Sequence, residues 1–133
     1  MNPLYPEIAR RAGHRCEYCL APEAAFNFRF EVEHITPAAF GGGDAQDNLA
    51  LACRSCNAFK SSRRVGTDPE TGAPAPLFHP RRDQWDEHFA VDSETDAING
   101  RTPTGRATVA LLQMNSSAQR LARRQWRRLE LFP

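Results

Sequence analysis

Two pairs of cysteines give this chain its clearest chemical signal. They are Cys16 and Cys19, and Cys53 and Cys56, each pair with two residues between its members. This spacing lets one turn present both thiolates to one ion, and four thiolates complete a tetrahedral site with no position left for a substrate. Two disulfides, a redox pair and ordinary buried cysteines are the alternatives. Paired motifs in a reducing compartment favour metal, so the pattern predicts structural zinc.

An acid, a histidine and two asparagines lie between and beside these pairs: Glu33, His34, Asn48 and Asn57. Metal-assisted cleavage of a phosphodiester needs a water nucleophile, a base and a cation that neutralises charge on the leaving oxygen. A histidine suits the base, since its ordinary pKa lies near working pH. Adjacent residues at a strand end point to different sides, so Glu33 can hold metal while His34 faces water. Each residue also has a simpler interpretation: a surface acid, a strand-end histidine, a turn asparagine and a helix cap.

Four short motifs follow one another in this stretch: Glu33-His34-Ile35, Gly41-Gly42-Gly43-Asp44, Asn48-Leu49 and Cys53-x-x-Cys56-Asn57-x-x-Lys60. Together they resemble the HNH nucleases, in the branch with four cysteines, over about Cys16–Lys60. The resemblance implies a ββα-metal (His-Me finger) core in which His34 is the general base. It also implies that Glu33 and Asn57 ligate a catalytic divalent ion and that Asn48 braces the loop around His34.

Asn57 stands where the family pattern more usually has histidine, so the chain is similar to the HNN variants of the family. A carboxylate and an amide oxygen are hard ligands, which favour Mg²⁺ or Mn²⁺ over softer ions. We therefore expect two metals of different character, a structural Zn²⁺ on sulfur and a catalytic Mg²⁺ or Mn²⁺ on oxygen.

Basic residues beside this core are candidates for nucleic-acid binding. Arg63 and Arg64 come directly after the metal helix and are predicted to contact DNA phosphates, and Lys60 is either a phosphate contact or a solvated helix lysine. Five further arginines lie between residues 120 and 128, mostly along one helix face. They form either a phosphate-tracking surface or a solvated face above inward-packed Leu121, Trp126 and Leu129.

The elements that must position these residues follow from periodicity and chain breakers. We predict a helix over 5–12, a strand over 25–34, a glycine-rich loop over 36–47, a second hairpin strand over 49–52 and a helix from 54 to about 63. An irregular connection over 66–76 and an extended aromatic segment over 77–91 should follow. Two last helices are predicted over 104–114 and from a cap at Asn115 or Ser116 to about 131.

Length and composition indicate one soluble globular domain spanning residues 1–133. The chain is 41% hydrophobic and 25% charged with a net charge of +1, which argues against a protein that coats nucleic acid nonspecifically. We expect a small α+β fold, with a zinc-stapled core at about 14–64 and a C-terminal extension at about 77–133 similar to that of bacterial HNH members. No membrane-length apolar run and no signal peptide are found, so a cytoplasmic location is expected.

The sequence thus favours a metal-dependent HNH endonuclease that hydrolyses DNA. The alternative from another class is a non-catalytic zinc module that binds DNA or protein, which would keep the cysteines without needing Glu33 and His34 opposite Asn57. RNA is a further candidate substrate. Nothing in the pattern indicates sequence preference, oligomeric state or whether one or both strands are cut.

Overall fold

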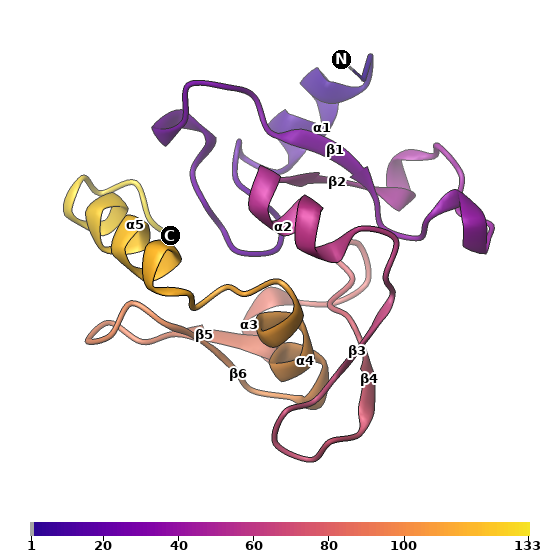
Figure 1. Ribbon diagram of the computed structural model, residues 1–133. Helices are drawn as coiled ribbons and strands as arrows, with labels where there is room; N and C mark the ends of the chain where they lie inside the picture. The colour runs from indigo at the N-terminus through magenta and orange to yellow at the C-terminus, as the bar shows by residue number, and fades with distance from the viewer. Residues whose placement is uncertain (1) are drawn as a thin grey trace.

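The computed structural model describes residues 2–133 and shows short helices alternating with short strands (Figure 1). The predicted α+β class is confirmed. The elements are α1 (Tyr5–Arg11), β1 (Glu31–His34), β2 (Leu49–Ala52), α2 (Arg54–Lys60), β3 (Val65–Thr67), β4 (Pro74–Pro76), α3 (Trp85–His88), β5 (Phe89–Val91), β6 (Ile98–Gly100), α4 (Pro103–Leu111) and α5 (Ser117–Arg128). Within residues 2–133 the strands form three antiparallel hairpins, β1–β2, β3–β4 and β5–β6.

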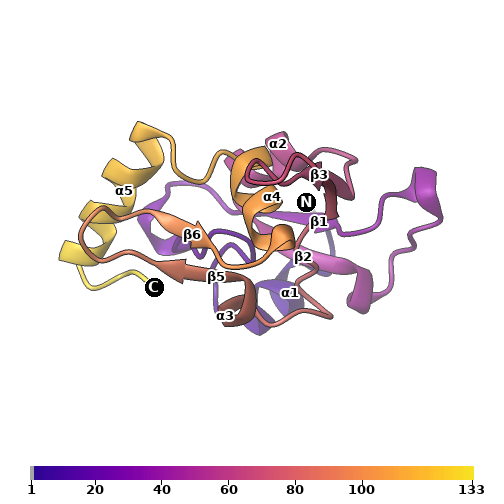
Figure 2. The ribbon, with the colours of Figure 1, turned by 90° about the horizontal axis from the view of Figure 1, so that it is seen from below.

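The first hairpin and the helix after it form a ββα unit. β1 and β2 are in a register that places Glu31 opposite Ala52 and His34 opposite Leu49. Every residue of β2 is fully buried, and both α1 and α2 pack on the hairpin. The loop that joins β1 and β2 projects at the end of the molecule opposite α5, as Figures 1 and 2 both show.

The first strand is shorter than the sequence predicts. The alternation of phenylalanines suggests a strand over 25–34, but only Glu31–His34 is one, and Glu23–Ala25 forms a 3₁₀ turn. Phe26 instead packs edge-on against Phe28 and Phe30, with ring centroids 5.6 and 5.0 Å apart. The aromatic pattern therefore arises from rings packing on one another, an arrangement that a period of two cannot distinguish from a strand.

The second helix also ends early, and the next segment is more regular than expected. α2 ends at Lys60 because Ser61 has a positive φ of 50°, which breaks the helix three residues before the predicted end. The segment predicted to be irregular contains the β3–β4 hairpin, whose prolines lie in a strand with a single partner. The segment over 77–91, predicted as extended, contains the short helix α3 before β5.

Close packing of α4 depends on two glycines. α4 packs on β3, β4 and β6. A Cβ added at Gly105 would lie 2.0 Å from the carbonyl oxygen of His88, and one added at Gly100 would lie 2.4 Å from the backbone nitrogen of Arg106. Both positions need glycine because the backbones approach too closely for any side chain. The close approach at Gly105 also brings α4 against the end of α3, where His88 lies.

Two buried aspartates tie the C-terminal hairpins to the helices. The carboxylate of Asp68 accepts hydrogen bonds from Nε and Nη2 of Arg106 in α4, at 2.9 Å each. That of Asp96 accepts from Nε of Arg124 at 3.0 Å and from Nη1 of Arg127 at 2.6 Å, both in α5. Arg106 lowers the pKa of Asp68, and the two α5 arginines lower that of Asp96. Arg124 and Arg127 thus stabilise the folded structure, because they pair with the buried carboxylate of Asp96.

Other residues of α5 differ from the predicted solvated face above inward-packed leucines, and phosphate contact by its exposed arginines stays a prediction. Arg123 is fully buried and donates to the backbone oxygens of Asp96 at 2.6 Å and Met114 at 2.7 Å. Trp126 packs inward as expected, whereas Leu121 and Leu129 are exposed. The helix therefore turns Arg123 and Trp126 to the interior, which its spacing of arginines does not reveal.

No helix in residues 2–133 has the length and apolar character needed to cross a membrane.

Candidate metal centre and active site

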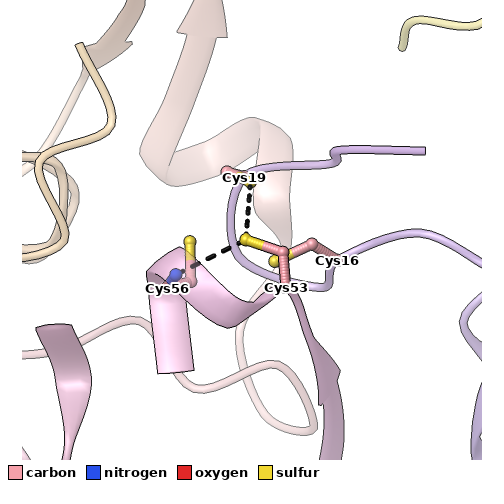
Figure 3. A group of neighbouring side chains, drawn as sticks. All are labelled: Cys16, Cys19, Cys53 and Cys56. Atoms are coloured by element: carbon pink, nitrogen blue, oxygen red, sulfur yellow. Dashed lines mark hydrogen bonds between the residues drawn. The ribbon is translucent and has the colours of Figure 1, made fainter. Parts of the chain in front are cut away.

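The four cysteines meet at one point in the interior. Their sulfurs all lie within 4.8 Å of one another, and Sγ of Cys19 is 3.8 Å from Sγ of Cys53 (Figure 3). Four sulfurs around an ion at about 2.3 Å form a tetrahedron with edges of roughly 3.8 Å. A disulfide needs sulfurs about 2.05 Å apart, and all four thiols are free. The cluster therefore fits one tetrahedral metal ion and excludes the disulfide alternative in this structure.

Local backbone geometry aims each pair at this point. The turn after α1 is closed by hydrogen bonds from Cys16 N–H to Ala21 O and from Leu20 N–H to Cys16 O, both 2.9 Å. Cys53 is the N-cap of α2, and its Sγ accepts the N–H of Cys56 at 3.4 Å. Hydrogen bonds among the thiols lower the pKa of Cys53 and raise those of Cys19 and Cys56. The two turns thus present four thiols at one point, and a bound ion would displace their protons.

Residues distant in the sequence enclose the cysteine cluster, and their role was not predicted. Gln119 of α5 donates to Oγ of Ser55, between the second pair, at 3.2 Å. Arg15, next to Cys16, donates to the backbone oxygen of Leu131 at 2.7 Å. Trp85 donates from its indole to the backbone oxygen of Tyr18, inside the first pair, at 2.8 Å. The C-terminal segment is thus part of the frame that holds the cysteines, which only tertiary packing could reveal.

Glu33, His34 and Asn57 line one shallow depression, together with residues at the end of α2. The side chain of His34 is 38% exposed, and its Nε2 lies 2.7 Å from Oδ1 of Asp44 in the glycine-rich loop. A carboxylate can only accept, so Nε2 is the donor in this contact, and in a neutral ring Nδ1 is the acceptor. Asp44 thus orients an imidazole that is partly exposed to solvent.

Asn48 holds the loop that follows His34. Its Oδ1 accepts the N–H of Thr36 at 2.8 Å, and its Nδ2 donates to the backbone oxygens of Thr36 at 3.0 Å and Gly43 at 2.8 Å. Gly42 packs so closely here that a Cβ would lie 1.7 Å from Thr36 O. Asn48 thus joins the two ends of the loop between His34 and Asp44, which fixes the spacing of that pair.

The carboxylate of Glu33 is buried at the depression, and two side chains already contact it. Glu33 is 5% exposed; Oε1 accepts a hydrogen bond from the hydroxyl of Tyr18, and Oε2 lies 3.1 Å from Nζ of Lys60. Burial raises the pKa of Glu33, and the charge of Lys60 acts against that rise. Asn57 donates from its amide nitrogen to the carboxylate of Glu31, which lies on the same face of β1 as Glu33. The sequence pattern assigns Glu31 no role.

Comparison with known proteins agrees with this arrangement of a hairpin, a helix and two cysteine pairs. The model of the HNH endonuclease family matches residues 16–63. Residues 16–63 are thus similar to an HNH domain, and this segment keeps that name below. The match spans both cysteine pairs, the loop with Asn48 and the residues around the depression, so the resemblance inferred from the motifs is confirmed. Neither curated proteins nor solved structures give a match to the chain.

The oxygen donors of the HNH domain suit a hard divalent ion. Each carboxylate oxygen has two lone pairs, so the single hydrogen bonds to Tyr18 and Lys60 leave Glu33 with acceptor capacity. Asn57 uses its amide nitrogen in the contact with Glu31, and the oxygen is the atom that a cation would take. The two residues thus carry oxygen donors of the kind that the family pattern implies, and a catalytic ion held by them stays a prediction.

Lys60 is the predicted site residue whose placement differs most from expectation. It is 1% exposed, and its ammonium donates to Glu33 and to the backbone oxygens of His34 at 3.3 Å and Ile35 at 3.0 Å. The prediction of a phosphate contact or a solvated lysine is wrong for this structure, because the ammonium is saturated inside the HNH domain. Its physical role here is to compensate Glu33 and to tie α2 to the end of β1.

Arg63 and Arg64 remain exposed beside the HNH domain. The guanidinium of Arg64 lies 4.0 Å from the ring centroid of Phe40, on the loop between β1 and β2. A cation held over an aromatic face keeps its outward N–H groups available. Both side chains are thus accessible, and the phosphate contact that the sequence predicts for them stays a prediction.

We expect Lys60→Met to lower the free energy of unfolding by roughly 3–5 kcal/mol, because it leaves Glu33 as an unpaired buried acid. The double variant Lys60→Met/Glu33→Gln should recover much of this loss, since it removes the charge as well as its partner. Urea unfolding followed by circular dichroism measures both, with exposed Arg63→Met as a matched control that should change stability by about 0.5 kcal/mol or less. A single variant as stable as the control would show that the ion pair is not formed in solution.

Proposed function

We propose that the chain is a metal-dependent endonuclease that hydrolyses phosphodiester bonds in DNA. The observation that carries this proposal is the placement of His34, a partly exposed imidazole oriented by Asp44, on one depression with Glu33 and Asn57. A module that only bound nucleic acid would need the cysteine frame but no oriented imidazole opposite two oxygen ligands. The match of residues 16–63 to the HNH endonuclease family supports the same function.

In the proposed mechanism Nδ1 of His34 removes a proton from the attacking water, and Asp44 stabilises the imidazolium that forms. Asn48 keeps the loop closed so that this pair stays in register, and it does not touch the substrate. Mg²⁺ or Mn²⁺ held by Glu33 and Asn57 would neutralise the charge that develops on the leaving oxygen. Zn²⁺ on the four cysteines would have a structural role, fixing the start of α2 and hence Asn57.

The surroundings of the site agree with a nucleic-acid substrate. Arg63 and Arg64 are exposed immediately after α2, and we propose that they contact phosphates on either side of the scissile bond. Such contacts position a strand without reading its bases. We also infer that residues 1–133 act as one domain, because α5 and Trp85 contact the cysteine turns directly. Four free thiols are consistent with the reducing environment of the cytoplasm.

The purified protein should be incubated with supercoiled plasmid and with a structured RNA, in Mg²⁺, Mn²⁺, Ni²⁺ or Zn²⁺, or without added divalent ion. We expect the plasmid to be cleaved with Mg²⁺ and Mn²⁺, with substantially less cleavage by the softer ions, because the ligands are oxygens. If protein slows the migration of the plasmid in a gel but no metal supports cleavage, the binding module is favoured. Cleavage of the RNA alone would change the substrate class. Better cleavage with Ni²⁺ or Zn²⁺ would contradict the assigned ligand set.

A further inference from the structure

A second cavity, of about 330 Å³, lies next to the depression that holds His34. The HNH domain contributes Ile35 and Thr36, directly after His34, and Lys60 and Arg64 from the other side. The rest of the wall comes from the segment between Pro76 and Thr104, outside the family match. The cavity therefore lies where the C-terminal extension meets the strand end that carries the proposed base.

The inner part of this cavity is apolar. Ile35, Leu77 and Phe78 are buried and line it, and the imidazoles of His79 and His88 stand beside them, partly exposed. The ring of His88 lies edge-on to Phe78, with centroids 5.9 Å apart. At about 330 Å³ the cavity is at the lower end of the range of ligand sites, about 300–1,000 Å³. Flat rings on an apolar floor are the usual surface for an unpaired nucleobase.

The rim of the cavity is cationic. Arg64 and Arg82 are both exposed there. The acid in the wall, Asp83, accepts the backbone N–H of His79 at 2.9 Å, so it closes a turn. Nδ1 of His79 accepts the N–H of Arg81 at 3.2 Å, which leaves Nε2–H as a donor. Two guanidinium groups and an imidazole donor above an apolar floor match a group that is anionic at one end and flat at the other.

We propose that this cavity binds one unpaired nucleotide of the substrate strand, with its phosphate at Arg64 and Arg82 and its base against His79 and His88. This inference rests on the proposed nuclease function and adds a substrate preference to it. A base that is paired and stacked in a duplex cannot enter a cavity of this size without being flipped out. Single-stranded, frayed or damaged DNA therefore binds with a smaller free-energy cost of unpairing than an intact duplex.

Binding is tested on the zinc-loaded His34→Ala protein, which keeps the substrate intact, in buffer without added Mg²⁺. Fluorescence anisotropy compares a labelled 12-nucleotide single strand with the duplex of the same sequence. We expect the single strand to bind more tightly, and His79→Ala and Arg82→Ala each to weaken its binding by about ten-fold. Arg82→Ala should also reduce the slope of log affinity against log salt by about 0.7. Exposed Arg10→Ala in α1, which lines neither the cavity nor the depression, is the matched control and should leave single-strand affinity within about two-fold of the parent.

Equal affinity for the two DNA forms, or cavity variants that bind the single strand like Arg10→Ala, would overturn the nucleotide site. Arg82 is exposed, so its variant stays informative even where His79→Ala is poorly folded. The two proposals fail separately. If the wild type cleaves plasmid while the cavity variants bind normally, the nucleotide site is contradicted and the nuclease function stands. If single-strand binding depends on Arg82 in a protein that never cleaves, the nucleotide site stands and the nuclease function is contradicted.

Discussion

His34→Ala is expected to lower metal-dependent cleavage of DNA by about 10²–10⁴-fold, the range by which general-base catalysis accelerates such steps. The ring is partly exposed and the side chain of its partner, Asp44, is 92% exposed, so the substitution should leave stability within about 0.5 kcal/mol. Cleavage rates of plasmid under single-turnover conditions measure the first effect, and thermal unfolding measures the second. A variant that cleaves at the wild-type rate would remove His34 from the chemistry.

Asp44→Asn provides a graded comparison within the same pair. An amide at this position can still accept from Nε2 but no longer stabilises an imidazolium by charge. Because the carboxylate is so exposed, solvent screens it, and we expect the rate to fall by only about ten-fold. Loss of activity equal to that of His34→Ala would instead assign Asp44 a direct part in the reaction.

Cys16→Ser is the second change with a large expected effect, because it removes one of four ligands from a closed site. Structural zinc sites contribute about 10–16 kcal/mol to the folding of small domains, as much as the whole stability of a typical domain. We therefore expect the variant to lose its bound metal and its cooperative thermal transition. Metal analysis should find about one zinc per chain in the wild type, and chelation should mimic the variant.

Ser55→Ala is the matched control for the cysteine substitution, since Ser55 lies between Cys53 and Cys56 and contacts Gln119 without being a ligand. It should keep the metal and unfold cooperatively, with stability lowered by about 0.5–1.5 kcal/mol for one hydrogen bond. A Cys16→Ser protein that is metal-free and yet unfolds like this control would contradict a structural role for the cluster.

The parts of the fold that sequence predicts best are those with local signals. The strand over 49–52 is reproduced without error because it is a buried apolar run between turn signals, and Ser116, one of the two predicted caps, caps α5. The strand predicted over 25–34 fails at its first half because ring-on-ring packing of Phe26 and its neighbours imitates a two-residue period. The β3–β4 hairpin was missed because prolines are normally breakers, and only an edge position tolerates them.

In the site, too, sequence predicts the features with local signals and misses those that depend on tertiary packing. Cysteine spacing predicts the cluster because a two-residue gap is itself a geometric constraint, and Asn48 makes the loop contacts that a bracing residue needs. Lys60 could not be placed from sequence, since a lysine on a short helix is normally solvated, and its burial depends on how α2 crosses β1. Gln119 and Trp85 were equally out of reach, because they contact the cysteine turns across more than sixty residues of chain.

Chemical rescue of His34→Ala tests the central claim most directly. The variant and the wild type, each loaded with about one zinc per chain, are given plasmid and Mg²⁺ with increasing imidazole. Because His34 lies in an open depression, imidazole can reach the space that the side chain leaves. We predict that imidazole restores cleavage to the variant in proportion to its concentration and leaves the wild type unchanged. A variant that stays inactive at every imidazole concentration, or one that cleaves without imidazole, would contradict the assignment of His34 as the base.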